Sequence, residues 1–286
     1  MKAARLAPYI FVLLWSTGFI GAKYGLPYAD PFIFLSLRVF IAAAILYIVA
    51  LIVRAPVAIG SREIRNSMLI GFFLHTCYLG GVFFAISVGL SASVAAVVTS
   101  LQPVLVSLLA VRVLGEKLRK VQVAGLAIGL IGVILVLGPT LKSDIPITGL
   151  LSVAVALIGS TAATLLQKKI GTGIPLLAGT IYQYLASGSV LALAAITTGG
   201  VSIQWSPKFM LAFIWSIAVL SVVAVLLLLW LINSGSAATV SSLFYLVAPA
   251  TAVEAYFLFE EKVNTQGLIG IAVTALGVWL VIRAAS

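Results

Sequence analysis

Long stretches without a charged residue constrain the fold of this chain more than any other feature of its sequence. Most of them approach or exceed the ~20 apolar residues that a helix needs to cross a bilayer. Only 8% of the 286 residues are charged, whereas a soluble domain usually has about 25%. We therefore expect an integral membrane protein with no stretch left for a soluble domain. The uncharged runs are 6–22, 39–53, 66–111, 121–141, 145–167, 170–207, 209–253 and 263–282.

Two of these runs, 66–111 and 209–253, are too long for a single crossing. Each contains a short segment rich in glycine and serine, at 89–93 and 233–236, which is typical of a turn. Each run is therefore expected to form two helices. The sequence thus predicts an all-α integral membrane protein with ten transmembrane helices. Their predicted ranges are 6–26, 32–53, 67–88, 92–111, 121–138, 147–167, 175–197, 209–232, 237–258 and 266–283.

Basic residues are unevenly divided between the two ends of the predicted helices. Cytoplasmic loops of membrane proteins carry the excess of positive charge, so both termini are predicted to be cytoplasmic, in a multi-pass protein of the cell inner (plasma) membrane. The net charge of +10 reflects this topology, and we expect a lipid bilayer, not a nucleic acid, as the partner. One end holds Lys2, Arg5, Arg54, Arg62, Arg65, Arg112, Lys117, Arg119, Lys120, Lys168, Lys169 and Arg283, and the other holds only Lys23, Lys142, Lys208 and Lys262.

The second half of the chain repeats features of the first at a shift of 145 or 146 residues. The halves 1–141 and 142–286 would each supply five helices. Because five is odd, the second copy must enter the membrane from the opposite side, which makes the halves an inverted repeat. Such halves can exchange conformations around a central site, as carriers do. The matched positions are Gly89 with Gly235, Pro103 with Pro249, Glu116-Lys117 with Glu261-Lys262, Gly125 with Gly270, and Gly132-Val133 with Gly277-Val278.

Several short motifs carry a family resemblance: Leu14-Trp15-Ser16, Arg38, Gln102-Pro103, Gly115-Glu116-Lys117, Gly125 to Gly132-Val133, Ala248-Pro249, Glu261-Lys262 and Gly277-Val278. On these motifs the chain resembles the EamA family of the drug/metabolite transporter (DMT) superfamily over nearly its whole length. Within that family it looks most like the YddG-type exporters of aromatic amino acids. The resemblance implies two tandem five-helix domains and an export function. The second half departs from the pattern, with Ser160 at the Trp15 position and Gln183 at the Arg38 position.

Polar and aromatic side chains deep inside the predicted helices are the candidates for substrate binding. Such groups usually face the interior of a helix bundle, where they find partners or water. Apolar walls with sparse polar groups would suit a small amphiphile, such as an aromatic or other hydrophobic amino acid. The alternative for each residue is a structural contact between helices. The cavity candidates are Trp15, His75, Tyr78, Thr99, Gln102, Ser160, Thr164 and Tyr245.

Four further residues are candidates for hinges or gates. Pro103 and Pro249 lie at matched positions inside helices, where a proline bends the backbone, and a static kink is the alternative. Arg38 could bind a substrate carboxylate or hold the outer gate. Glu254 could form a gate contact or carry a proton. For both charged residues, snorkelling of the charge to the membrane surface is the alternative.

Enzymatic and metal-dependent functions find no support in the sequence. His75 is the only histidine and Cys77 the only cysteine, so neither a zinc site nor a Ser/His/Asp triad can be assembled. We expect no catalytic residue, no metal site and no cofactor. The leading function is a secondary transporter that exports a small-molecule substrate, an amphiphilic metabolite, by alternating access. Proton antiport, exchange and facilitated diffusion are all compatible with it. A multidrug or organic cation exporter, a channel and a lipid scramblase are the alternative functions.

Glycines in the fifth and tenth predicted helices allow helices to approach closely. They are Gly125, Gly129, Gly132, Gly270 and Gly277. These residues could pack inside the protein or form a contact between two copies. We expect internal packing and a monomer, with a dimer as the alternative.

Overall fold

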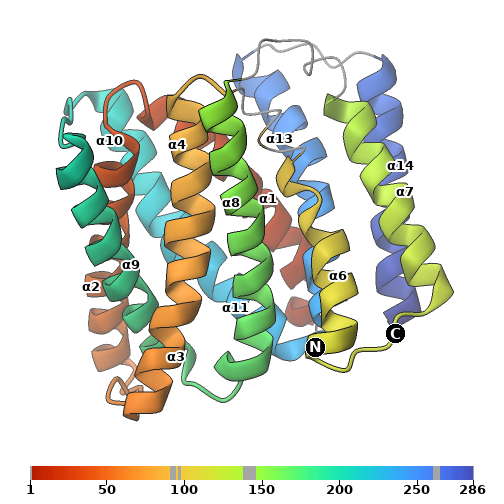
Figure 1. The fold of residues 1–286 in the computed structure, drawn as a ribbon, viewed down its shortest axis with the longest axis horizontal. Coiled ribbons are helices and arrows are strands. Elements are labelled where there is room, and N and C mark those ends of the chain that lie inside the picture. The colour runs from red at the N-terminus through yellow and green to blue at the C-terminus, as the bar shows by residue number, and fades with distance from the viewer. Residues whose placement is uncertain (1, 91–94, 96–97, 138–145, 260–264, 286) are drawn as a thin grey trace.

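The computed structural model describes residues 2–90, 95, 98–137, 146–259 and 265–285. Within these residues the structure is helical, apart from an antiparallel bridge between Ala29 and Ile203. The helices form one bundle with both termini at the same end (Figure 1). The α-helices are α1 (Lys2–Gly25), α2 (Pro31–Ile52), α3 (Ser61–Gly71), α4 (Gly81–Ser87), α6 (Gln102–Val113), α7 (Lys120–Leu137), α8 (Ile147–Leu166), α9 (Leu176–Thr198), α10 (Pro207–Trp215), α11 (Val225–Ser234), α12 (Ala237–Ser242), α13 (Phe244–Phe259) and α14 (Thr265–Ala285). The π-helices are η1 (Phe72–Gly80), η3 (Gln167–Gly171) and η4 (Ser216–Ala224).

Most helix ends agree with the predicted ranges to within a few residues. The main difference is α3, which begins at Ser61, well before the predicted start at 67. The Glu63 carboxylate accepts a hydrogen bond from the Gly60 backbone N–H over 2.7 Å and caps this first turn. The absence of charge therefore marks the apolar part of the helix and not its end. The predicted helix 92–111 lies partly outside the described residues, and α6 is its described part.

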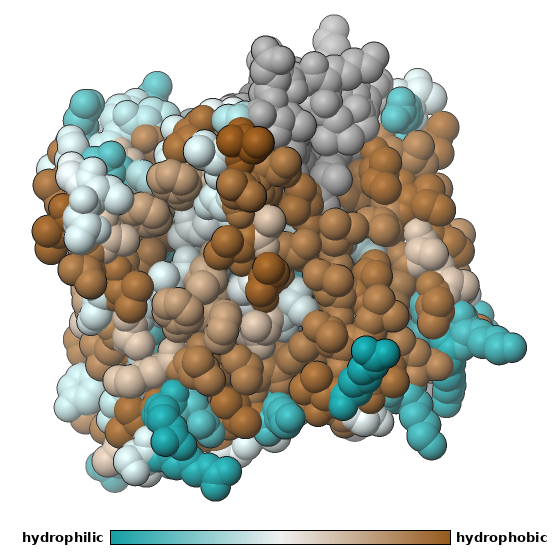
Figure 2. All heavy atoms as spheres, viewed as in Figure 1, coloured by the Kyte–Doolittle hydropathy of each residue, from teal (hydrophilic) through white to brown (hydrophobic). Residues whose placement is uncertain are grey.

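Six helical segments of the described chain are long and apolar enough to cross a membrane. Large hydrophobic side chains face outward on many helices, among them Ile48, Leu193 and Leu211. Figure 2 shows the result, a broad apolar band with hydrophilic side chains gathered mainly near the two ends of the helices. Such a surface needs lipid around it, so the molecule is a multi-pass membrane protein. The six segments are Pro31–Ile52, Ser61–Ser87, Ile147–Gly171, Leu176–Thr198, Pro207–Ser234 and Thr265–Ala284.

The packing of α1 is matched by the packing of α8. The helix α1 contacts α13 on one side and α10 and η4 on another, while α8 contacts α6 and, separately, η1 and α4. Two more helix pairs, α2 with α9 and α7 with α14, make extensive contacts. Figure 1 shows these two pairs at opposite edges of the bundle. The contacts of α1 and of α8 thus follow the same pattern.

The α7–α14 pair is held together by glycines that leave no space between the two backbones. A Cβ atom on Gly277 would lie 2.6 Å from the Gly129 Cα, and one on Gly125 would lie 2.7 Å from the Gly277 carbonyl oxygen. Any side chain at these positions would force the helices apart. These glycines therefore pack inside the molecule, as expected.

The two longest helical segments both change from α to π geometry in their middle. The segment Ser61–Ser87 contains η1, and the segment Pro207–Ser234 contains η4. The two π-helices are nine residues each and begin 144 residues apart, at Phe72 and Ser216. A π-helical turn is wider than an α-helical one and is frequently found at functional sites. Both π-helices contribute residues to the site described below.

Candidate functional site

A buried cavity lies where α1, α2, η1, α4 and η4 meet. Its walls are apolar except for the Arg38 guanidinium, the Trp15 indole N–H and the Tyr78 hydroxyl. The cavity has a volume of about 30 Å³, which is enough for about two waters. A larger solute would need the walls to move apart. The cavity is lined by Trp15, Gly18, Ala22, Arg38, Tyr78, Leu79, Val82, Phe83 and Leu220.

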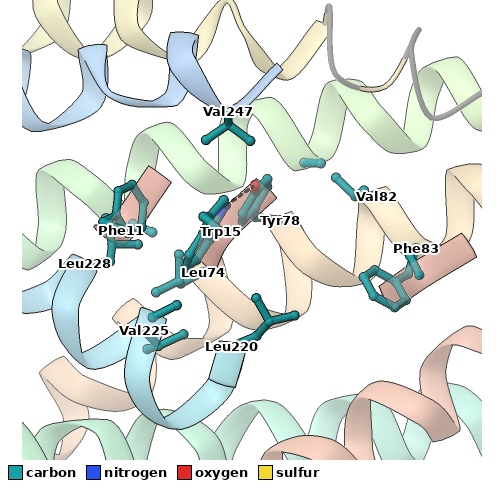
Figure 3. Close-up of a cluster of buried hydrophobic side chains, with 14 of the residues drawn as sticks. Phe11, Trp15, Leu74, Tyr78, Val82, Phe83, Leu220, Val225, Leu228 and Val247 are labelled. Atoms are coloured by element: carbon teal, nitrogen blue, oxygen red, sulfur yellow. Dashed lines mark hydrogen bonds between the residues drawn. The ribbon is translucent and has the colours of Figure 1, made fainter. Parts of the chain in front are cut away.

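Trp15 and Tyr78 form one wall of this cavity. Their rings are parallel, with centroids 6.5 Å apart, and the Trp15 indole N–H donates to the Tyr78 hydroxyl over 3.4 Å (Figure 3). Phe11 and Phe244 pack against the Trp15 ring at centroid distances of 5.2 and 5.7 Å. These contacts fix the orientation of the indole, so the wall presents a rigid aromatic surface to the cavity.

Arg38 is the one charged residue among the described lining of this cavity, and only 2% of its surface is exposed. Its Nε donates to the Ser221 hydroxyl of η4 over 2.7 Å. The Tyr184 hydroxyl donates to the Ser221 backbone carbonyl and holds that turn in place. The Arg38 Nη1 is buried and has no hydrogen-bond partner among the described residues. This burial excludes snorkelling to the membrane surface.

A second, smaller cavity of about 10 Å³ lies nearer the opposite end of the bundle. Three of its lining residues lie 145 or 146 residues after residues that line the first cavity. They are Gln167 after Ala22, Gln183 after Arg38, and Leu229 after Phe83. The two linings therefore share three positions at the shift seen in the sequence. The second cavity is lined by Ser67, Ile70, Gln167, Gly171, Ile174, Pro175, Leu176, Gly179, Gln183 and Leu229.

A layer of buried polar side chains separates the two cavities. His75 packs against the Tyr184 ring with centroids 4.7 Å apart, and it interacts with both Arg38 and Gln183. Neither ring nitrogen of His75 has a well-aligned hydrogen-bond partner among the described residues, and the same holds for the Gln183 Oε1. His75 does not line the first cavity but lies between the two. The layer is rich in groups that could bond to a polar solute or to water.

Two pairs of residues in this layer are related by the shift seen in the sequence. Ser221 lies 146 residues after His75, and Gln183 lies 145 residues after Arg38. Arg38 donates to Ser221, whereas Gln183 interacts with His75 without a well-aligned hydrogen bond. Ser221 was not predicted from the sequence, although the shift applied to His75 would have found it. Tyr184 was also overlooked, because an apolar run does not reveal which face of a helix is buried.

The remaining cavity candidates lie outside both cavity linings and mostly contact other helices. The Gln102 side-chain amide donates to the Thr164 hydroxyl over 3.1 Å and connects α6 to α8. Ser160 bonds within its own helix, to the Leu157 carbonyl. Tyr245 packs against α7 at Gly129, and its hydroxyl has no described partner. The Thr99 hydroxyl donates to the Ala95 carbonyl.

The hinge and gate candidates occupy different environments. Pro103 lies in the first turn of α6, just after a break in the helical hydrogen bonding at 100–101, whereas Pro249 lies inside α13. The Glu254 carboxylate accepts a hydrogen bond of 2.5 Å from the Ser16 hydroxyl and so links α13 to α1. Its Oε2 is buried without a described partner.

A helical bundle that exposes apolar side chains to lipid and encloses two small cavities around a polar layer has the architecture of a polytopic membrane transporter. The chain belongs to the EamA-like transporter family, whose model matches residues 5–138 and 147–283. This family is part of the DMT group of transporters, as its motifs predicted. The protein is accordingly a membrane transporter.

Relatives and a solved structure support the same assignment. The chain is 23% identical to the uncharacterized transporter YvbV of Bacillus subtilis over 98% of its own length and 91% of that protein. It is 28% identical to the uncharacterized inner membrane transporter YedA of Escherichia coli K12, over 70% of the chain and 65% of YedA. A probable amino-acid metabolite efflux pump of Salmonella typhimurium is 25% identical over 56% of the chain and 52% of the pump. A crystal structure with 20% identity superposes over the whole chain and 98% of its own with a TM-score of 0.83, which shows the shared fold.

Proposed function

We propose that this protein is an alternating-access carrier that exports small amphiphilic metabolites, foremost amino acids with aromatic or other hydrophobic side chains, across the inner membrane. The observation that carries the proposal is the pair of cavities on either side of one polar layer. In such a carrier one cavity widens as the other closes, so the solute is never connected to both sides at once. Here the first cavity is the larger, with a volume of about 30 Å³ against about 10 Å³ for the second.

The proposed carrier has ten membrane-spanning helices in two inverted halves, 1–141 and 142–286, with both termini in the cytoplasm. Three observations support this arrangement. The contacts of α1 and α8 match each other, the termini lie at the same end of the bundle, and the family model matches the chain twice. The end that holds the termini also carries most of the basic loops, as the positive-inside rule requires of a cytoplasmic face. The second cavity would then open to the cytoplasm.

The walls of the first cavity support an amphiphilic solute. Trp15, Tyr78 and Phe83 offer aromatic surface, while the polar groups are few. Aromatic and aliphatic walls bury the apolar part of a solute, and sparse polar groups orient its head. The name of the Salmonella relative, an amino-acid metabolite efflux pump, points to the same class of solute.

Organic cation export, a channel and lipid scrambling are less well supported by the site. A buried guanidinium in the cavity repels a cation. The polar layer around His75 separates the two cavities with packed side chains, whereas a channel needs a continuous path. A scramblase would need a polar groove along the lipid-facing surface, but the face shown in Figure 2 is mostly apolar between its ends.

Counterflow in proteoliposomes tests this proposal. Vesicles containing the purified protein would be preloaded with unlabelled phenylalanine, and the entry of labelled phenylalanine would be followed. The carrier predicts uptake that saturates and is accelerated by internal phenylalanine. Protein-free vesicles and internal D-phenylalanine are the controls. Uptake without trans-stimulation would contradict the carrier, and no uptake of phenylalanine, tryptophan or leucine would contradict the proposed substrate class.

A further inference from the structure

We propose that Arg38 binds the carboxylate of the transported solute, so that the substrates are apolar monocarboxylates and an α-amino group is not required for binding. This inference rests on the proposed carrier function and refines its substrate class. It starts from a buried cation that has no counter-charge nearby. A guanidinium that is 2% exposed has lost most of its hydration, and such a group needs an anion or several acceptors to be stable.

Among the described residues, Arg38 has one hydrogen-bond acceptor, the neutral Ser221 hydroxyl, which it reaches through Nε. The Nη1 is left without a partner in a side chain that lines the cavity. The described lining of the cavity includes no carboxylate. Glu254 is the one acidic residue in the interior of a described helix, and it bonds to Ser16 on α1 instead. The vacant donor on a buried charge therefore faces a space that only a solute or water can fill.

The repeat argues that packing alone does not require a charge at this position. Gln183 lies 145 residues after Arg38, in α9, and lines the second cavity. A neutral amide thus satisfies the same architecture in the second half. The positive charge of Arg38 is present in one half only, which indicates a chemical role for it.

The geometry favours a carboxylate over other anions and over a free ammonium. One guanidinium matches the single charge of a carboxylate, whereas a phosphate dianion usually recruits several basic groups. The aromatic wall formed by Trp15 and Tyr78 stands beside Arg38 and suits a phenyl or indole body. An ammonium would be repelled by Arg38, and the described lining offers it no carboxylate.

Three ligands that share a phenyl group distinguish recognition of a carboxylate from recognition of an ammonium. Binding of phenylalanine, 3-phenylpropionate and 2-phenylethylamine would be measured on the purified full-length protein in nanodiscs. We expect the two carboxylates to bind with affinities within ~10-fold of each other, and the amine to bind at least ~10-fold more weakly, because a charge-assisted hydrogen bond is lost. Equal or tighter binding of the amine would overturn the inference, and so would the absence of binding by both carboxylates.

Substitution of Arg38 is the second part of this test. Arg38→Gln introduces the residue that the second half already has at the equivalent place, so it should fold, and it should remove the preference for carboxylates. Arg38→Lys should keep part of the preference for carboxylates. Ser221→Ala is the matched control, since it removes the neutral partner but keeps the charge, and should retain the preference. Retention of the preference in Arg38→Gln would overturn the inference. Should neither Arg38 variant fold, the three-probe comparison on the wild type decides. If Arg38→Gln leaves phenylalanine counterflow unchanged, Arg38 does not bind the carboxylate, but the proposed carrier function still stands.

Discussion

The Glu116 carboxylate accepts a hydrogen bond from the Ala237 backbone N–H over 2.8 Å, and so joins the loop after α6 to the first turn of α12. On the other side of the same turn, the Lys168 ammonium donates to the Gly235 carbonyl over 2.6 Å. A carboxylate at a helix start and an ammonium at a helix end both complement the helix dipoles. Together with the bond from Gln167 to Asn233, these contacts close the end of the bundle near the second cavity. They form a clamp, defined by Glu116, Lys168 and Gln167, between segments far apart in the sequence.

Removing Glu116 should open this end of the bundle. Loss of a helix cap typically costs about 0.5–2 kcal/mol, which would shift a closed conformation toward an open one several-fold. A cysteine at Ala110, which is fully buried beside the clamp, would report the opening in a Cys77→Ser background. We expect Glu116→Ala to raise the rate of maleimide labelling at this cysteine several-fold.

Glu63 provides the control for the clamp, because it caps α3 away from α12. Glu63→Ala should leave the labelling rate at position 110 unchanged. An unchanged rate in Glu116→Ala as well would show that the clamp does not hold this end closed.

Adding a methyl group at Gly277 should destabilise the protein strongly. The new Cβ would meet the Gly129 backbone, which cannot move aside as a flexible side chain can. We expect Gly277→Ala to cost about 1–3 kcal/mol, measured as a fall in the midpoint of thermal unfolding in detergent. Gly21→Ala is the matched control, because nothing lies within 4 Å of its added Cβ. Equal midpoints for the two variants would refute the close approach of α7 and α14.

The aromatic wall should depend on ring surface more than on its hydrogen bond. The Trp15–Tyr78 bond is long at 3.4 Å, so Tyr78→Phe should alter the apparent KM for phenylalanine in counterflow by less than ~3-fold. Trp15→Ala removes the stacked ring and should raise KM by at least ~10-fold. Trp15→Phe should lie between them. The reverse order, with Tyr78→Phe the more damaging, would mean that the hydroxyl contacts the solute directly.

The Gln102–Thr164 pair is expected to join helices and not to select the substrate. Thr164 also donates to the Ser160 carbonyl, so it keeps a partner when Gln102 is lost. We expect Gln102→Leu to change the free energy of unfolding by no more than about 1 kcal/mol and to leave the ratio of phenylalanine to leucine counterflow unchanged. A stable variant with an altered ratio would instead place Gln102 on the path of the solute.

Much of the fold could be predicted because a bilayer allows few structures. Backbone groups in lipid must bond within helices, so each uncharged run had to be helical, and the turns near Gly89 and Gly235 divided the two long runs where the helices end. The start of α3 was missed because charged residues continue that helix into water. The π-helices gave no signal at all, since a run that is apolar on every side has no periodicity to read.

The site was predicted less completely, because sequence gives the depth of a residue but not the direction it faces. Depth alone selected Trp15 and Tyr78, which line the first cavity. The same criterion selected Gln102 and Tyr245, which face other helices. Arg38 was expected to bind a solute carboxylate or to hold the outer gate, and it lies in the wall of the first cavity.

Labelling of two engineered cysteines would show whether the two cavities open alternately. Ala22→Cys reports on the first cavity and Ser67→Cys on the second, each in a Cys77→Ser background and labelled with a membrane-impermeant maleimide from both sides of the membrane. Alternating access predicts that each cysteine is labelled from one side only, position 22 from outside and position 67 from the cytoplasm. It also predicts that Glu116→Ala speeds labelling at 67 and slows it at 22. Simultaneous acceleration at both positions, or labelling of either from both sides, would contradict it.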